Sequence, residues 1–166
     1  MDSDVKIAEI ILEPETGSVK HIALFSDDLR FKCQCCATLC CKLGGPRLSS
    51  TDVERLQRAG LADDEFVDKA NKCMQNTASG ACVLLEFDSE KQSYTCKVYR
   101  YRPTMCRLYP FHVEKASSNR FVIRLLPCKG VSHHVGAVID ERFLTDNVLS
   151  QVPQLARHTR NCQQNI

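Results

Sequence analysis

The chain has 166 residues, and its 22 basic and 20 acidic side chains give a formal net charge of +2 at neutral pH. This length predicts one domain with an ordinary hydrophobic core, and the balanced charge argues against nucleic acid as a partner. The apolar runs are far shorter than the about 18 residues of a membrane-spanning helix, so we expect no membrane contact. The feature that needs an explanation is the presence of eleven cysteines.

The first segment predicts a β-hairpin that leads the chain to its cysteines. Residues 5–12 and 19–25 are loosely alternating apolar stretches, and the turn residues 13–18 separate them. The N-terminus lacks the basic start and apolar core of a secretory signal, which predicts a cytoplasmic protein. In a reducing cytoplasm, clustered cysteines bind metal more often than they form disulfides.

Five of the eleven cysteines lie in the stretch Cys33 to Cys41, which reads Cys-Gln-Cys-Cys-Ala-Thr-Leu-Cys-Cys. Cys33 and Cys36 have the spacing of a tight turn that lets two thiolates face one metal. Neighbouring cysteines such as Cys40 and Cys41 are poor geometry for a local disulfide, and they cannot easily face one centre. The pair therefore indicates either two neighbouring centres or one ligand beside a packing thiol.

Two short helices are expected next. Gly44-Gly-Pro46 is a helix breaker that lets the backbone wrap a metal. Thr51 to Glu54 fits a capping box, and Gly60 would end that helix. A second helix is expected to begin at Asp63. Its buried side chains would be Phe66, Val67 and Ala70.

The remaining segments predict two hairpins and a final helix. The first hairpin joins residues 82–87 to 94–99, with Cys82 and Cys96 on its two strands. Prolines at 103 and 110 would hold Cys106 on a loop or short helix. The second hairpin joins 111–115 to 121–126 and ends at Cys128, and a helix near 135–149 could cover the sheet. The expected fold is α+β, with small antiparallel hairpins and a few short helices around a cysteine-ligated metal centre.

These residues resemble a known family over about residues 31–130. The matching motifs, in order, are Cys-x-x-Cys-x-x-x-Cys-Cys at 33–41, Cys82-Val-Leu-Leu, Cys96-Lys-Val-Tyr99, Arg102-Pro103, Cys106-Arg107, Tyr109-Pro110-Phe111 and Cys128-Lys-Gly130. Together they are similar to the YkgJ-type cysteine-cluster family, described as zinc- or iron-chelating domains. In the usual family pattern only two residues precede the double cysteine, whereas Ala37-Thr-Leu39 intervenes here. This departure leaves open which of Cys35, Cys36, Cys40 and Cys41 are ligands.

The resemblance implies eight metal-ligating thiolates. They are Cys33, Cys36, Cys40, Cys41, Cys82, Cys96, Cys106 and Cys128. Eight thiolates would fill two four-cysteine centres, or one cluster with additional structural thiols. The other three cysteines, Cys35, Cys73 and Cys162, are expected to be buried or surface free thiols. The metal-binding core would span about 31–130 within one domain, 1–166, and a helical cover would span about 135–160.

Several residues near these cysteines could support the centre. Arg102 and Arg107 flank Cys106 and could donate hydrogen bonds to sulfur and offset its charge, or they could pair with surface acids. Three aromatic residues would pack around the centre and exclude water, namely Tyr99, Tyr109 and Phe111. Two histidines, His133 and His134, are second-choice ligands.

Dispersed ligands favour an iron-sulfur cluster over zinc, because zinc sites are typically built from two Cys-x-x-Cys pairs. We expect one or two 4Fe-4S clusters, with zinc as the alternative. Three functions follow: an electron-transfer protein or one that supports a partner's chemistry, a structural zinc module that binds a partner, or a protein-modifying enzyme. The family resemblance extends to the cysteine-rich part of flagellin lysine methylases, but the chain has no glycine-rich nucleotide loop. A protein partner is expected in each case.

Overall fold

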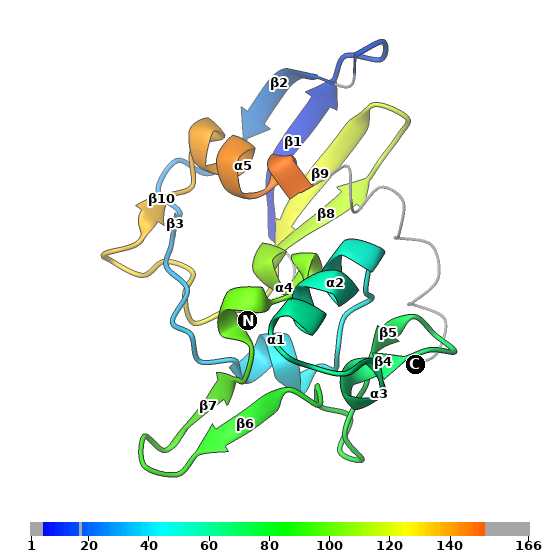
Figure 1. Ribbon diagram of the computed structural model, residues 1–166. Helices are drawn as coiled ribbons and strands as arrows, with labels where there is room; N and C mark the ends of the chain where they lie inside the picture. The colour runs from blue at the N-terminus through cyan, green and yellow to red at the C-terminus, as the bar shows by residue number, and fades with distance from the viewer. Residues whose placement is uncertain (1–4, 17, 152–166) are drawn as a thin grey trace. The chain divides into compact units, whose positions relative to one another are not determined.

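The computed structural model describes residues 5–16 and 18–151, and it shows an α+β fold of short antiparallel strands and short helices (Figure 1). This fold class confirms the sequence prediction. The chain divides into two compact units. Within the described residues, unit 1 consists of 5–16, 18–34 and 108–151, and unit 2 consists of 35–107. The single-domain boundaries stay a prediction. Within the described residues, no helix has the length and apolar character needed to cross a bilayer.

Unit 1 is built on a four-stranded antiparallel sheet in the order β2-β1-β9-β8. Its strands are β1 (Val5–Leu12), β2 (Val19–Leu24), β8 (Phe111–Lys115) and β9 (Arg120–Leu125). Both predicted hairpins form, with Ile10 opposite Ile22 in one and Val113 opposite Ile123 in the other. Ile10 also faces Phe121 across β1 and β9, so aliphatic and aromatic side chains gather on one face of the sheet.

The core of unit 1 joins this sheet to α5 (Glu141–Asn147). Ile10 and Ile123 are fully buried, as are Leu144 and Val148, and all four belong to one cluster. The helix begins late because Asp140 is its N-cap, whose Oδ1 accepts a hydrogen bond from the Phe143 amide at 2.7 Å. The predicted helix over 135–149 was therefore too long at its start. A 3-10 turn, η2 (Leu149–Gln151), follows α5, and the expected helical cover beyond it lies outside the described residues.

Part of that predicted helix instead forms a short strand. β10 (Ala137–Val138) pairs with β3 (Arg30–Phe31), which directly precedes the cysteine-rich stretch. Gly136 allows this close approach, because a Cβ atom there would lie 2.8 Å from the Phe31 carbonyl carbon. The pairing fixes the backbone that leads to Cys33 within unit 1.

Unit 2 consists of short elements around a second, smaller core. Its helices are α1 (Thr38–Lys42), α2 (Ser50–Arg58), α3 (Asp63–Phe66) and α4 (Thr104–Leu108), with the 3-10 turn η1 (Tyr99–Tyr101). Its strands are β4 (Val67–Asp68), β5 (Cys73–Met74), β6 (Leu85–Asp88) and β7 (Ser93–Cys96). The core contains Leu56 and Phe66, both fully buried, together with Cys41 and Cys82.

The start of α2 differs from the prediction. The capping box is formed by Ser49 and Asp52 rather than by Thr51 and Glu54. Ser49 Oγ accepts from the Asp52 amide at 3.1 Å, and Asp52 Oδ2 accepts from the Ser49 amide at 3.1 Å. The earlier cap is favoured because it places the Asp52 side chain in the interior, where other donors reach it. Gly60 has the predicted left-handed backbone after the helix, at φ +89°.

Two other expectations in unit 2 were wrong in detail. The helix that begins at Asp63 ends after one turn at Phe66, and Ala70 is exposed rather than buried. Asp68 explains this ending, because its Oδ1 accepts from the Ala70 amide and draws the chain into a turn. Cys96 lies on β7 as predicted, but Cys82 precedes β6 in a turn instead of lying on the strand.

Candidate metal centre

Unit 2 gathers five free thiols from four separate parts of the chain. Cys40 and Cys41 lie on α1, Cys82 in the turn before β6, Cys96 at the end of β7 and Cys106 on α4. The Cys82 amide donates to the Cys41 carbonyl at 2.9 Å, so the backbone itself joins that turn to α1. The β6–β7 hairpin then returns Cys96 opposite Leu85, three residues after Cys82.

The Cys41 thiol is the centre of this group. It is 5% exposed and interacts with the thiols of Cys40, Cys82 and Cys96. A thiol has one hydrogen to donate, so these contacts favour a protonated Cys41 beside three more acidic neighbours. The contact with Cys40 is the largest of the effects that raise the pKa of Cys41 well above its ordinary value, and its contacts with Cys82 and Cys96 add to it.

The neighbouring thiols ionise more readily. Contact with the Cys41 thiol lowers the pKa of Cys40 to about 7 and that of Cys96 to about 7, against the raising effect of burial. The same contact lowers the pKa of Cys82. Because the thiolate is the form that binds metal, these residues have suitable ligand chemistry near neutral pH. Burial, followed by the charges of Cys82 and Cys96, raises the pKa of Cys106.

Arg102 is a cation whose charge acts on these thiols. Its charge contributes to lowering the pKa of Cys40 and of Cys96. The guanidinium stacks over the Tyr99 ring at 3.8 Å from the ring centroid, and its Nε donates to the Tyr99 carbonyl at 3.0 Å. Tyr99 therefore orients Arg102, which extends the predicted packing role.

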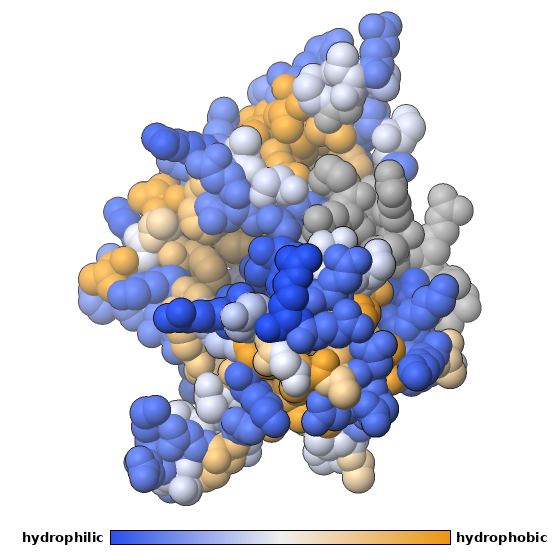
Figure 2. Space-filling model, viewed as in Figure 1, coloured by the Kyte–Doolittle hydropathy of each residue, from blue (hydrophilic) through white to orange (hydrophobic). Residues whose placement is uncertain are grey.

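Arg107 lies in a different environment, on α4 beside Asp52 and Arg55. Burial and the like charges of Arg55 and Arg102 lower the pKa of Arg107, whereas Asp52 raises it. Its Nη2 approaches Thr104 Oγ1 at 3.5 Å. Arg107 thus belongs to a group of arginines, and Figure 2 shows the most hydrophilic residues gathered over α2 and α4.

A buried aspartate holds α4 in place, and sequence reasoning missed it. Asp52 is 2% exposed, and its Oδ1 accepts from the Thr104 amide at 2.9 Å, from Thr104 Oγ1 at 3.0 Å and from Arg55 at 2.9 Å. Arg55 also donates to the Arg102 carbonyl at 3.4 Å. These bonds fix the segment that carries both Arg102 and Cys106. The sequence signal that could have indicated Asp52 is the pattern Ser49-x-x-Asp52, which is a capping box that begins two residues before the expected one.

Unit 1 holds two further candidate ligands on neighbouring backbone segments. Cys33 follows Lys32, whose amide donates to the Gly130 carbonyl at 3.0 Å, and the Gly130 amide donates to Cys128 Sγ at 3.3 Å. Gly130 permits the approach, because a Cβ atom there would lie 2.4 Å from the Lys32 carbonyl oxygen. Cys36 belongs to unit 2 and is half-buried before α1.

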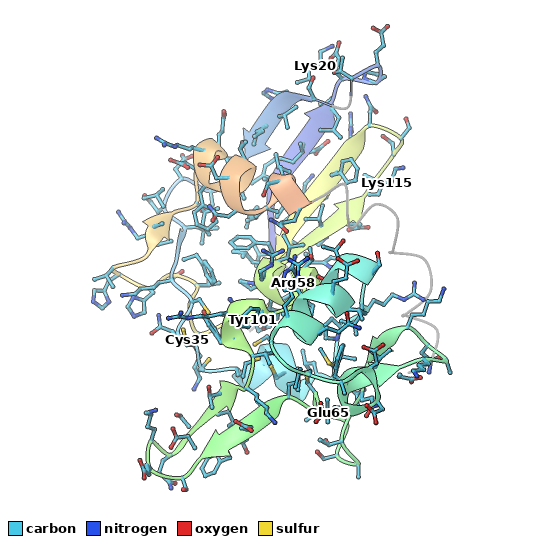
Figure 3. The ribbon with its side chains drawn as sticks, in the orientation of Figure 1. Lys20, Cys35, Arg58, Glu65, Tyr101 and Lys115 are labelled. Carbon is cyan, nitrogen blue, oxygen red and sulfur yellow. The ribbon has the colours of Figure 1, made fainter. Side chains whose placement is uncertain are left out.

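The other candidate residues have simpler roles. Cys35 is exposed with a left-handed backbone, and Figure 3 labels it. Cys73 lies half-buried on β5, and Cys162 lies outside the described residues. His133 and His134 stack at 4.8 Å between ring centroids. The remaining aromatics belong to unit 1, where Tyr109 donates to the Pro127 carbonyl and Phe111 packs edge-on against Phe31 in the sheet core. The role expected of Phe111 around the centre stays a prediction.

The donor chemistry of the five thiols in unit 2 fits a thiophilic metal, since thiolate sulfur is the preferred ligand of zinc and of iron-sulfur clusters. The Cys41 thiol contacts those of Cys40, Cys82 and Cys96. Across residues 5–16 and 18–151, no three His, Cys, Asp or Glu side chains are arranged to hold a metal ion.

Comparison with known proteins gives one family. Residues 32–129 match the family model CxxCxxCC, which is described as "Putative zinc- or iron-chelating domain". No curated protein and no solved structure gives a significant match. The matched range contains all eight candidate ligands and covers more than half of the chain. The chain therefore belongs to this cysteine-cluster family, the YkgJ-type family of zinc- or iron-chelating domains.

Proposed function

We propose that unit 2 binds a 4Fe-4S cluster through its cysteine thiolates and that the protein uses it to transfer electrons or to support a partner's chemistry. The observation that carries this proposal is the meeting of five free thiols from α1, the turn at Cys82, β7 and α4. Ligands that come singly from distant segments suit a cluster, which is larger than a single ion and gathers thiolates over a wider span.

The residues suggest how the ligand roles would be divided. Cys40, Cys82 and Cys96 have lowered pKa values and would supply three thiolates. Cys41 or Cys106 would supply the fourth, because each has a raised pKa and would lose its proton only to a bound metal. When bound, a 4Fe-4S cluster supplies one-electron redox chemistry, and the surrounding charges tune its potential.

Arg102 and the buried core would support that centre. The positive charge of Arg102 favours thiolates at Cys40 and Cys96, and it would offset part of the negative charge of a thiolate-ligated cluster. Leu84 and Val98 are buried in the same core as Cys41 and would limit the access of water.

Zinc is the second candidate, and a specific observation favours it. Cys41 interacts with three other thiols. This close spacing is what a single ion needs, because four sulfurs at Zn–S distances of about 2.3 Å lie in near contact with one another. A zinc ion would stabilise the fold and its binding surface without redox chemistry.

Metal identity in protein purified without oxygen separates the two candidates. Iron and acid-labile sulfide in equal amounts, about four of each per cluster, with brown colour that bleaches on reduction, would support the cluster. Colourless protein with stoichiometric zinc would instead support the structural zinc site. Protein that holds neither metal after reconstitution with each would overturn both. Single Cys→Ser changes at Cys41 and Cys106 would then show which residue supplies the fourth ligand.

A further inference from the structure

Unit 2 carries a surface rich in arginine next to its thiols. We call it the arginine face, and it consists of Arg55 and Arg58 on α2, Arg100 on η1, Arg102 at the end of η1 and Arg107 on α4. Arg58, Arg100 and Arg107 are exposed, whereas Arg55 and Arg102 are half-buried. Figure 3 labels Arg58, and Figure 2 shows this part of the surface in the most hydrophilic colour.

The arginines of this face act on one another. Burial lowers the pKa of Arg107 and the charges of Arg55 and Arg102 add to this effect, so both guanidinium groups are within electrostatic reach of Arg107. Arg55 also donates to the Arg102 carbonyl at 3.4 Å. Arg58 follows Arg55 by almost one turn of α2, and Arg100 lies two residues before Arg102. Arg55, Arg102 and Arg107 therefore lie close together, and Arg58 and Arg100 extend this set along α2 and η1.

The elements that carry this face contain more arginines than acids. α2, η1 and α4 contribute two acids, Asp52 and Glu54, against the five arginines. Asp52 is buried, and its oxygens already accept hydrogen bonds from Ser49, Thr104 and Arg55. A buried, fully bonded carboxylate stabilises the interior but leaves the outward potential of the face positive.

Two apolar side chains lie within the same surface. Tyr101 is 42% exposed and Met105 is 40% exposed, between and beside the arginines of η1 and α4. Tyrosine, methionine and arginine are the residue types that protein interfaces enrich, and tyrosine and arginine supply most of the binding energy. A solvated charged face would have no need for these apolar side chains.

The face also lies next to the thiols. Arg102 lowers the pKa of Cys40 and Cys96 through its charge, so these groups are within electrostatic reach. Met105 directly precedes Cys106 on α4. A molecule bound on the arginine face would therefore lie beside the centre that the thiols would hold.

We propose that the arginine face docks an acidic protein partner, whose carboxylates pair with the arginines while an apolar side chain packs on Tyr101 and Met105. This proposal deepens the proposed function, because it names the class of partner that would use the metal centre. A protein fits better than nucleic acid, since the whole chain has a net charge of only +2 and the apolar part of the face suits a folded or peptide ligand.

Fluorescence anisotropy with designed peptides tests the docking on the metal-loaded protein and on metal-free protein separately. The probe is a labelled peptide of about 12 residues with six Asp or Glu and two Leu, and it is compared with a version in which Lys replaces each acid. We expect binding of the acidic peptide only, and at least about tenfold weaker binding when the salt rises from about 20 to about 300 mM.

Matched variants locate the site. Charge reversal by Arg58→Glu with Arg100→Glu should weaken acidic-peptide binding at least about tenfold. The control reverses two exposed lysines elsewhere in unit 2, Lys69→Glu with Lys91→Glu, and should change binding less than about threefold. Tyr101→Ser should weaken binding about fivefold at high salt, where the apolar contact dominates.

Three outcomes would overturn the docking proposal. The first is an equal loss of acidic-peptide affinity in the arginine and lysine reversals. The second is equal binding of the acidic and lysine peptides. The third is tighter binding of a single-stranded oligonucleotide with the same charge as the acidic peptide, which would make the face a nucleic acid site. Because binding is also measured without metal, loss of docking with an intact metal centre would contradict this proposal alone. Absence of any metal would contradict only the proposed function.

Discussion

Units 1 and 2 are stabilised by different means. The four-stranded sheet of unit 1 has strands of five to eight residues whose inward side chains, such as Ile10 and Ile123, form a continuous apolar core. Unit 2 has two pairs of short strands. The strands are four residues long in one pair and two residues long in the other. Two of the buried side chains of unit 2 are the thiols of Cys41 and Cys82. Short elements bury less apolar area, so we expect metal bound by these thiols to contribute to the stability of unit 2. The comparison predicts that metal removal and core truncation act on different units.

The largest expected effect follows from removing the Cys82 thiol, which contacts Cys41. Cys82→Ser should abolish metal binding, and the amides of α1, β6 and β7 should lose their protection from hydrogen exchange, because metal binding of this kind contributes about 10 kcal/mol to folding. Protection in β1 and β9 should remain. Hydrogen exchange followed by mass spectrometry, resolved by peptide, measures both units at once.

The control for this change is Cys73→Ser, which alters a half-buried thiol on β5 outside the family pattern. It should retain the metal and the protection of both units. If the Cys82 variant lost protection equally in units 1 and 2, metal binding would not act on unit 2 alone. Retention of metal by this variant would also contradict the prediction.

The second-largest effect is expected from a substitution that shortens a side chain in the core of unit 1. Ile123→Ala removes a fully buried side chain that faces Val113 across the sheet, and it should lower the free energy of unfolding by about 3 kcal/mol. Chemical denaturation monitored by circular dichroism measures this loss, and the metal content of the folded protein should stay unchanged. Val19→Ala, at a 41% exposed position on β2, should change stability by less than about 0.5 kcal/mol. A large loss of metal in the Ile123 variant would contradict the expectation that the core of unit 1 does not affect metal binding by unit 2.

The sheet of unit 1 was predictable because alternating hydrophobicity and turn residues are local signals. The strands at 5–12 and 111–115 appear with the expected limits, and Gly60 ends α2 as expected. The family was predictable for a related reason, since the spacing of the cysteines is a property of the sequence alone.

The arrangement around the thiols was not predictable from local patterns. The bond from Thr104 to Asp52 joins residues 52 positions apart, and a sequence window shows neither partner's burial. The early end of α3 follows from the Asp68 turn and from the pairing of Val67 with Met74, which compete with the helical pattern. Contact between Cys41 and three other thiols depends on the fold of the whole unit.

The third effect concerns this long-range contact. Asp52→Asn keeps the shape of the side chain but removes its charge and one acceptor, so it should destabilise unit 2 by about 2 kcal/mol at pH 7. Burial raises the pKa of Asp52, but hydrogen bonds from Thr104 and Ser49 together outweigh it and hold the pKa below its ordinary value. The stabilisation is therefore present above the ordinary pKa and is lost as the pH falls through the lowered one.

Denaturation at several pH values checks the sign of this effect. The difference between the natural protein and Asp52→Asn should be full at pH 7. It should shrink as the pH falls from about 4, the ordinary pKa of an aspartate, through the lowered pKa of Asp52. Glu54→Gln changes an exposed acid on the same helix and should be close to neutral. A difference that does not depend on pH would show that the lost hydrogen-bond acceptor, and not the charge, accounts for the effect.

The smallest effect concerns the electrostatics that distinguish unit 2 from the apolar core of unit 1. Contact with Cys41 and then the charge of Arg102 lower the pKa of Cys40 to about 7. Arg102→Gln removes only the second contribution, so the apparent pKa of the thiols should rise by about half a unit, which corresponds to about 0.7 kcal/mol. Ultraviolet absorbance of thiolates in metal-free protein measures it. Arg102→Lys keeps the charge but loses the flat stacking on Tyr99, and it should shift the pKa less. Equal shifts in both variants would mean that Arg102 acts through packing, because a purely electrostatic role requires that lysine preserve most of the effect.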